Sequence, residues 1–231
     1  MRKIFLINGK KRSGKDNFAD ILVNQKKFTK ISIAQSLKLT ASRIVNISVD
    51  EIDNLKDNCL SFSFDEQEFT TGFIFELIKF SKKYNMTAEM KKRLASFNIK
   101  QLDIFIEVDG VQKIDARRFL QNMNVFKTIF DDEDIWINQT IDKINQLNGD
   151  IVISDFRFPN ECTRIKECFE NVTTIKIIGK NFYDMDEYDN HSSETSLNDW
   201  KFDYHINNTI WIESSLFWQI TALLQELSYV R

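Results

Sequence analysis

A glycine-rich segment near the N-terminus has the residue types and spacing that bind phosphate groups. Gly9, Gly14 and Lys15 match the pattern G-x-x-x-x-G-K in the segment GKKRSGK. Glycines let the backbone turn tightly, so that successive N–H groups can point at phosphate oxygens, and the lysine adds a mobile ammonium for the β- and γ-phosphates. We therefore predict that Gly9, Ser13, Gly14 and Lys15 bind a polyphosphate. The alternative is a glycine-containing turn with exposed lysines.

The residue after this lysine departs from the usual pattern. Serine or threonine normally follows and offers its hydroxyl to Mg²⁺, whereas this chain has Asp16 and then Asn17. A carboxylate beside a polyphosphate repels it unless a cation lies between them. We predict that Asp16 holds Mg²⁺, directly or through water, and that Asn17 belongs to the same nucleotide site. The alternative for Asp16 is a helix cap.

The loop also carries three successive cations, Lys10, Lys11 and Arg12. Without phosphates nearby these charges would repel one another. Arg12 is our candidate for neutralising charge on a phosphoryl group during transfer, as arginine fingers do.

A second charged segment, Asp155 to Glu161, follows a short apolar run that reads as a buried strand, Ile151–Ser154. Ligands of parallel sheets bind beyond the carboxyl ends of the strands, so we expect Asp155 and Arg157 to face the glycine-rich loop. The planar fork of an arginine suits a phosphate monoester. Asp155 and Glu161 are expected to accept hydrogen bonds from a sugar or base, or to orient Arg157. The alternative is a structural Asp–Arg pair.

Alternating strand and helix patterns predict the fold class. Lys3–Ile7 and Phe28–Ala34 read as strands, and each is followed by a helical pattern, which is typical of an α/β fold. We expect a three-layer α/β core with five mainly parallel strands, in residues 1–49 and 113–231, and a mostly helical insert at 50–112. Asp109-Gly110 predicts a hairpin inside that insert, and Asp115 a helix cap. The last strand and the last helix are expected at Phe202–Ile206 and Trp211–Leu227.

Composition narrows the class of protein. The 231 residues carry 31 Lys and Arg against 34 Asp and Glu, a net charge of −3, which argues against general nucleic-acid binding. Three cysteines without C-x-x-C spacing fit reduced thiols and a cytoplasmic protein. No apolar run approaches the roughly 20 residues that a membrane span needs, and the first residues do not resemble a signal peptide. A homodimer is left open.

Several motifs together resemble the bacteriophage deoxynucleoside monophosphate kinases, members of the P-loop kinase superfamily. The segment SGKD at 13–16 is similar to their loop, although animal phosphomevalonate kinases share it. D-x-R-x-x-x-E at 155–161, the Arg-Leu-Gln segment at 117–121, and H-x-S-E at 191–194 resemble further segments of the phage enzymes, in the same order along the chain. The Leu-Gln helix of the family continues with Gly-Thr, where this chain has Asn124 and Val125. The stretch at 50–112 shows no resemblance.

The resemblance implies a P-loop kinase core and transfer of the ATP γ-phosphoryl to a deoxynucleoside 5′-monophosphate with Mg²⁺, in the host cytoplasm if the protein is phage-encoded. It also implies roles for residues that spacing alone does not single out. Arg117 and Lys11 would hold the acceptor phosphate, Trp136 would stack on a base, and Asn207 would contact adenine. Leu37 and Lys38 lie where the family meets the nucleotide, and His191 and Glu194 would order a loop or lid. Core positions for Trp136, a solvated surface for Lys38 and a turn for Asn207 are the alternatives.

Two other functions fit the same residues. One is a kinase for another small phosphorylated acceptor, such as phosphomevalonate. The other is a nucleotide-binding module without catalysis, in which Asp16 marks the loss of activity.

Overall fold

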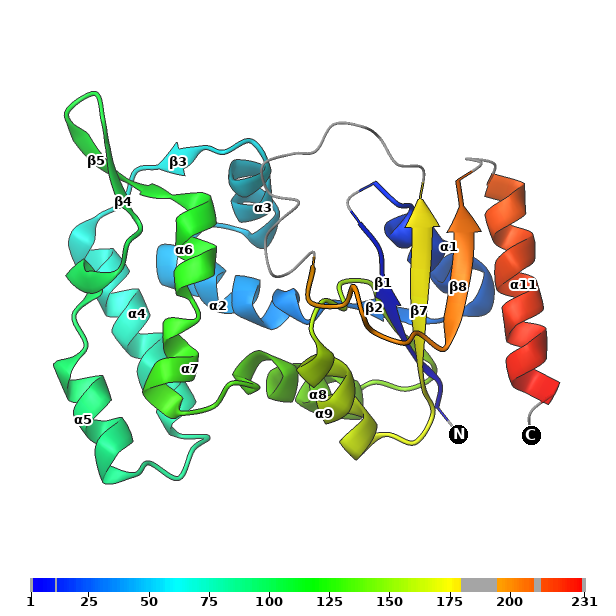
Figure 1. Cartoon of the computed structure of the whole chain (residues 1–231). Coiled ribbons are helices and arrows are strands. Elements are labelled where there is room, and N and C mark those ends of the chain that lie inside the picture. The colour runs from blue at the N-terminus through cyan, green and yellow to red at the C-terminus, as the bar shows by residue number, and fades with distance from the viewer. Residues whose placement is uncertain (1, 11, 180–194, 210–212, 230–231) are drawn as a thin grey trace. The chain divides into compact units, whose positions relative to one another are not determined.

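The structure, a computed structural model, describes residues 2–10, 12–179, 195–209 and 213–229 (Figure 1). The chain divides into two compact units. The first contains Met1–Ile33 and Ile137–Arg231, and the second contains Ala34–Trp136.

Five described strands of the first unit form one all-parallel sheet, in the order β2-β6-β1-β7-β8. This confirms the predicted α/β class and the parallel core. The strands are β1 (Ile4–Asn8), β2 (Thr29–Ile31), β6 (Ile151–Ile153), β7 (Val172–Gly179) and β8 (Tyr204–Asn208).

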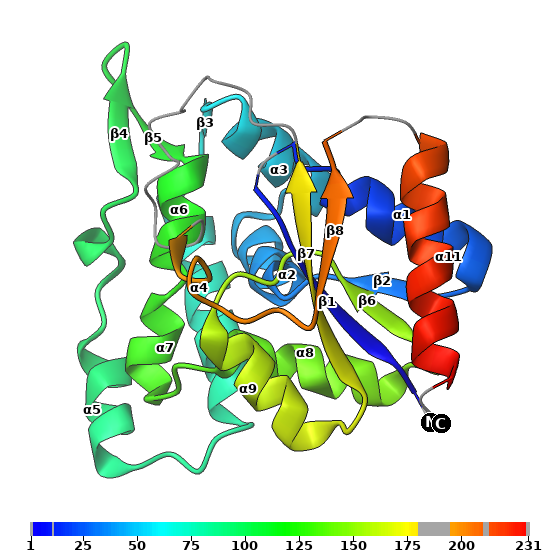
Figure 2. The ribbon, with the colours of Figure 1, turned by 45° about the vertical axis from the view of Figure 1, so that its right-hand side comes forward.

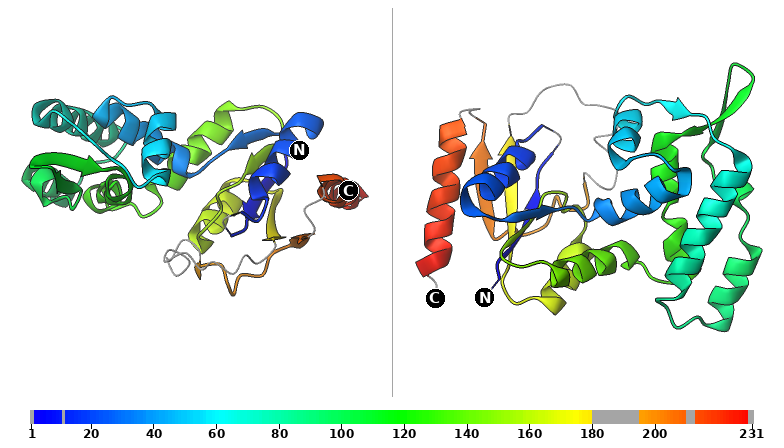
Figure 3. Two further views of the ribbon diagram at one scale, coloured as in Figure 1. Left: turned by 90° about the horizontal axis from the view of Figure 1, so that it is seen from above. Right: turned by 180° about the vertical axis from the view of Figure 1, so that it is seen from behind.

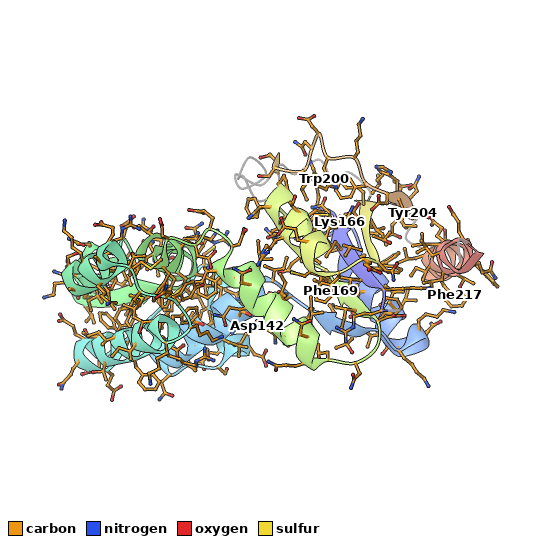
Figure 4. The ribbon with its side chains drawn as sticks, turned by 90° about the horizontal axis from the view of Figure 1, so that it is seen from below. Asp142, Lys166, Phe169, Trp200, Tyr204 and Phe217 are labelled. Carbon is orange, nitrogen blue, oxygen red and sulfur yellow. The ribbon has the colours of Figure 1, made fainter. Side chains whose placement is uncertain are left out.

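Helices cover both faces of this sheet because its strands are apolar on both sides. In β1, Phe5 and Ile7 pack toward α1 (Lys15–Lys26) and α11 (Glu213–Tyr229), whereas Ile4 and Leu6 pack toward α8 (Ile135–Gln146) and α9 (Pro159–Cys168) (Figure 2). Figure 4 labels residues of both layers. Phe169 and Trp200 belong to the α8 and α9 side, and Tyr204 and Phe217 belong to the α1 and α11 side.

The strand order places a topological switch between β1 and β6. The chain leaves β1 through α1 toward β2, and it leaves β6 through α9 toward β7, in the opposite direction across the sheet. Open parallel sheets bind ligands in the crevice beyond the carboxyl ends of such neighbouring strands. The segments after β1 and β6 are the two charged segments of the sequence.

The second unit combines helices with a small antiparallel sheet of order β3-β5-β4. Asp109 and Gly110 both have positive φ, 54° and 73°, so the predicted hairpin is confirmed, with the turn that this pair favours. The elements are α2 (Ala34–Val45), α3 (Val49–Asp57), β3 (Ser61–Phe62), α4 (Glu66–Ser81), α5 (Ala88–Ser96), a 3₁₀ turn (Ile99–Gln101), β4 (Phe105–Val108), β5 (Val111–Asp115), α6 (Ala116–Asn122) and α7 (Val125–Phe130).

An aromatic core makes the second unit wider than the insert expected at 50–112. Phe119 of α6 and Phe126 of α7 pack with Phe69 and Phe73 of α4. Helix α2 also belongs here, because Gly72 of α4 leaves room for its backbone and Arg43 pairs with the buried Glu76. Figure 3 shows the ribbon from above and from behind. The sequence on either side of 50–112 therefore contributes to the same unit.

Local expectations differ from the structure at several places. The last strand runs over Tyr204–Asn208 instead of Phe202–Ile206, because its parallel pairing with β7 continues to Gly179 opposite Asn208. Asp203 lies before the strand and accepts hydrogen bonds from the backbone and hydroxyl of Thr174. Helices α3 and α7 and strand β3 were not predicted individually. None of the described helices is long and apolar enough to cross a bilayer.

Candidate functional site

The loop between β1 and α1 ends in left-handed backbone. Gly14, the residue before α1, has φ of 91°, and Arg12 has φ of 63°. The Ser13 N–H donates to the Lys10 carbonyl at 3.0 Å, which closes a tight turn. Among the described residues, no side chain caps the first turn of α1. Its N–H groups and the positive end of the helix dipole therefore remain available to an anion.

Residues of strands β7 and β8 pack closely against this loop. Gly179 allows the contact from β7, because a Cβ there would lie 2.5 Å from the Ser13 Cα. From β8, the Asn208 amide donates to the Ser13 carbonyl at 2.9 Å, and a Cβ on Gly14 would collide with the same amide. The loop is therefore held by residues far away in the sequence.

Ser13 gives a second indication of an anion site. Its side chain belongs to a residue with 3% exposure, and its Oγ finds no hydrogen-bond partner among the described residues. A buried hydroxyl without a partner costs about 1–3 kcal/mol. A ligand at the N-terminus of α1 would supply an acceptor for it.

Charges of both signs flank the first turn of α1. The Lys15 ammonium lies 3.8 Å from Asp16, and the Lys30 ammonium of β2 lies 3.4 Å from Asp16 and 2.9 Å from Asp20. Burial lowers the pKa of Lys30, but its bond to Asp20 and the charge of Asp16 outweigh that effect and raise the pKa above its usual value. Lys30 is thus a cation that would compete with a metal ion for the Asp16 carboxylate. Asn17, the next predicted residue, is exposed.

The metal-ligating capacity of this site is small. Among the described residues, no three His, Cys, Asp or Glu side chains come together to hold a metal ion. Asp16 is 60% exposed and offers one carboxylate. Mg²⁺ commonly takes one or two protein carboxylates together with substrate phosphates and water. The donor set therefore fits a magnesium ion that arrives with a polyphosphate.

The segment after β6 lies against the end of β1. The Phe156 N–H donates to the Ile7 carbonyl at 3.2 Å, and the Asn8 amide donates to the Phe156 carbonyl at 2.8 Å. These bonds hold Phe156, and with it the start of the turn that contains Arg157, at the end of β1. The structure thus brings both charged segments of the first unit to one edge of the sheet.

Asp155 joins two strand ends. Its carboxylate accepts from the Ser32 hydroxyl at 2.6 Å and from the Ile33 N–H at 2.9 Å. These contacts connect the end of β6 to the segment after β2. Two hydrogen bonds to the same carboxylate thus hold the segments after β2 and β6 together.

Glu161 closes the same turn from inside. Its carboxylate accepts from the backbone N–H groups of Arg157 at 2.7 Å and Phe158 at 3.0 Å, and it is 6% exposed. Burial raises the pKa of Glu161 to about 7, against the two backbone bonds that favour the charged form. Glu161 is therefore a positioning residue for Arg157.

This assignment predicts a pH dependence of stability. Below pH 4.5 both folded and unfolded Glu161 hold the proton, whereas between 4.5 and about 7 only the folded carboxyl retains it. Stability is thus lost as pH rises through this window, by up to about 3 kcal/mol. Glu161→Gln keeps an acceptor oxygen but does not titrate, so its stability should not show this loss as the pH rises. Urea unfolding of both proteins at pH 5, 6, 7 and 8 measures the difference; parallel curves would contradict it.

In the second unit, two lysines bond one carboxylate, and an arginine bonds the backbone of one of those lysines. Lys38 of α2 and Lys56 of α3 bond Asp53 at 2.8 and 3.0 Å, and the Arg117 guanidinium of α6 donates to the Lys56 carbonyl at 3.4 Å. Burial raises the pKa of Asp53, but the two lysines outweigh it and hold the pKa below its usual value. The predicted residues Lys38 and Arg117 therefore share one cluster, to which Lys56 also belongs.

The remaining predicted residues have diverse positions. Trp136 is 5% exposed and packs with Phe80 and Phe126 in the aromatic core, against which Leu37 also packs. Asn207 lies inside β8, where its side chain accepts from the backbone and hydroxyl of Thr209. Lys11, His191 and Glu194 lie outside the described residues.

Three residues of the site were not predicted from the sequence: Asn8, Lys176 and Asn208. Lys176 donates to Asn8 at 2.7 Å and lies 5.1 Å from the centre of the Phe202 ring. A lysine within an otherwise apolar strand was an available signal for Lys176, whereas Asn208 could not be distinguished from its neighbour without the strand register. In comparisons with known proteins, no family model and no curated protein matches this chain.

Proposed function

We propose that this protein transfers the γ-phosphoryl group of ATP to a deoxynucleoside 5′-monophosphate, giving ADP and a deoxynucleoside diphosphate. One observation carries the proposal: a glycine-rich loop leads into an uncapped helix N-terminus, with the buried Ser13 hydroxyl lacking a described partner there. That arrangement suits a polyphosphate. The choice of acceptor rests on the resemblance of the charged segments to the phage kinases.

The donor side uses the first turn of α1. Its N–H groups and the Ser13 hydroxyl bind phosphate oxygens, and Lys15 places its ammonium on the β- and γ-phosphates. Arg12 neutralises charge on the phosphoryl group as it moves between oxygens. The transfer is direct and in line, so no covalent intermediate with the protein forms.

The acceptor side uses the turn after β6. Arg157 offers its two-pronged guanidinium to the monophosphate dianion. Asp155 and Glu161 act indirectly, because their carboxylates are bonded to the ends of strands and to the turn itself. Asp16 would hold a magnesium ion, which reduces the repulsion between the phosphates when it is bound.

We expect Asp16→Asn to raise the Mg²⁺ concentration for half-maximal rate by on the order of tenfold, because one metal ligand is lost. Asp20→Asn is the matched control, since Asp20 also pairs with Lys30 one turn further along α1. Rates measured over a range of Mg²⁺ concentrations at saturating substrates give the half-maximal Mg²⁺ concentration of both variants. If Asp16→Asn has an unchanged Mg²⁺ curve and only a small loss of stability, Asp16 acts on the helix and not on the metal.

Asn208→Ala should weaken ATP binding by roughly 5–30-fold, because it releases the loop and leaves the Ser13 carbonyl without its partner. Asn207→Ala is the neighbouring control, and its ATP affinity should stay within about twofold if Asn207 only orders the turn at Thr209. Calorimetric titration with ATP gives both dissociation constants. If ATP binding weakens equally in the two variants, the hydrogen bond from Asn208 to the Ser13 carbonyl is not the cause of the weakening.

A coupled ADP-release assay tests the function itself. The acceptors are the four deoxynucleoside monophosphates, the ribonucleotides and phosphomevalonate. Turnover with at least one deoxynucleotide and none with phosphomevalonate supports the proposal. Turnover only with phosphomevalonate selects the other kinase, and ATP binding without any turnover selects the non-catalytic module.

A further inference from the structure

Helix α4 is apolar on two sides, although a helix of a globular unit needs only one apolar face. Its inner side, with Phe69, Phe73, Leu77 and Phe80, is at most 3% exposed. Its outer side carries Ile74 at 48%, Phe75 at 65% and Ile78 at 48% exposure.

These outer residues form one continuous strip. At about 100° per residue, Thr71, Ile74, Phe75 and Ile78 fall within an arc of about 100°, and Thr71 is exposed as well. We call these four residues the α4 stripe. Contiguous exposed apolar side chains rimmed by polar residues mark interaction sites, whereas single ones need no explanation.

The charges at the two ends of α4 differ in sign. Glu66 and Glu68 lie at its N-terminal end, and Lys79 and Lys82 lie at its C-terminal end. Two copies of the helix packed antiparallel on their stripes would bring the acidic end of each against the basic end of the other. Parallel packing would bring like charges together.

A groove beside the acidic end offers further room. It has a volume of about 750 Å³ and lies between the end of α2 and the start of α4, with Asp65, Glu68 and Thr71 among its lining. In the antiparallel arrangement the basic end of the second helix reaches this acidic lining. The groove thereby extends the contact beyond the helix stripe.

We propose that the α4 stripe is a self-association surface, on which a second copy of this chain docks with its own α4 antiparallel. The inference is independent of the proposed function. Stable interfaces bury roughly 1,200–2,000 Å², whereas the α4 stripe offers only three large apolar side chains from each copy. We therefore expect a weak dimer with a dissociation constant on the order of 10 µM.

Sedimentation velocity from 1 to 200 µM tests the proposal. The wild-type chain should shift from monomer to dimer across this range, and Phe75→Glu should stay monomeric. Trp218→Glu is the control, because Trp218 is equally exposed, at 66%, but lies on α11; it should dimerise as the wild type does. A monomer at 200 µM, or a dimer that persists in Phe75→Glu, would overturn the proposal.

Charge exchange tests the antiparallel geometry with variants that keep the apolar residues. Glu68 and Lys82 are exposed and lie two helical turns on either side of Phe75. Glu68→Lys and Lys82→Glu should each weaken the dimer about fivefold or more, since two symmetric pairs change. The double variant should recover wild-type affinity within about twofold. Failure of the double variant to recover would overturn the arrangement.

Melting temperatures at 1 µM test whether the α4 stripe is instead covered by the same chain. Phe75→Glu should melt within about 2 °C of Trp218→Glu, because both side chains are largely exposed in the monomer. A much lower melting temperature for Phe75→Glu would mean that the chain itself covers the stripe, which would also overturn the proposal.

Discussion

Lys15→Ala should lower the rate of phosphoryl transfer by about 10²–10³-fold and leave the fold intact. The lost contact acts on charge that develops in the transition state, and such contacts contribute about 3–4 kcal/mol. The side chain is 19% exposed and stands at the first position of α1, next to the loop. Single-turnover measurements with saturating ATP and acceptor give the rate of the chemical step.

Lys26→Ala provides the matched control, because Lys26 is the last residue of the same helix. Its rate should stay within about twofold of the wild type, as expected for a surface substitution away from the site. Circular dichroism and melting temperature confirm that both variants are folded. A Lys15→Ala protein that is folded and retains a rate near that of the wild type would refute the phosphate-binding assignment of the β1–α1 loop.

Arg157→Ala should weaken binding of the deoxynucleoside monophosphate by roughly 10–150-fold, the equivalent of about 1.5–3 kcal/mol for a charge-assisted contact. Binding of ATP should change far less, because Arg157 belongs to the turn after β6 and not to the first turn of α1. Arg157→Lys should recover only part of the loss, since an ammonium cannot reproduce two parallel hydrogen bonds. Separate titrations with each ligand measure these constants.

Arg164→Ala is the control for this experiment. Arg164 lies on α9, directly after the turn, and it bonds Asn138 and Glu167. Its loss should leave both ligand affinities within about twofold. If Arg157→Ala instead lowers the melting temperature and weakens ATP and monophosphate alike, Arg157 is a structural strut.

Sequence periodicity predicted the core of the first unit well, because a strand buried on both faces needs a continuous apolar run. The predicted strand Lys3–Ile7 contains such a run; the strand itself is Ile4–Asn8, and alternate residues from Ile4 to Ile7 pack into the two opposite helix layers. Local residue types also predicted the helix cap at Asp115 and the hairpin at Asp109-Gly110. Each of these features depends on residues within a few positions of one another.

Contacts between distant residues could not be predicted in this way. The strut from Asn208 to the Ser13 carbonyl joins positions 195 residues apart and depends on the register of β8 against β7. The expected strand, Phe202–Ile206, ends two residues before the observed one, so Asn208 was not expected to lie within it. The bonds of Asp155 to Ser32 and Ile33 likewise follow from β2 and β6 being neighbours in the sheet, which no local pattern encodes.

The extent of the second unit was underestimated for a related reason. Its core is built from phenylalanines spread from α4 to α7, and α2 joins it through the pair of Arg43 with the buried Glu76. The sequence of α2 reads equally well as a helix on the sheet, so its partner is decided by tertiary packing. The same uncertainty affected Trp136, which packs in this core.

The most direct test of the account is to follow phosphorus itself. Wild-type protein is mixed with ATP, Mg²⁺ and the four deoxynucleoside monophosphates, and ³¹P NMR records the products over time. We predict that ADP and a deoxynucleoside diphosphate appear in equal amounts, and that both appear at least about 10²-fold more slowly with Lys15→Ala. Unchanged ATP, or release of inorganic phosphate without any new diphosphate, would contradict the proposed transfer.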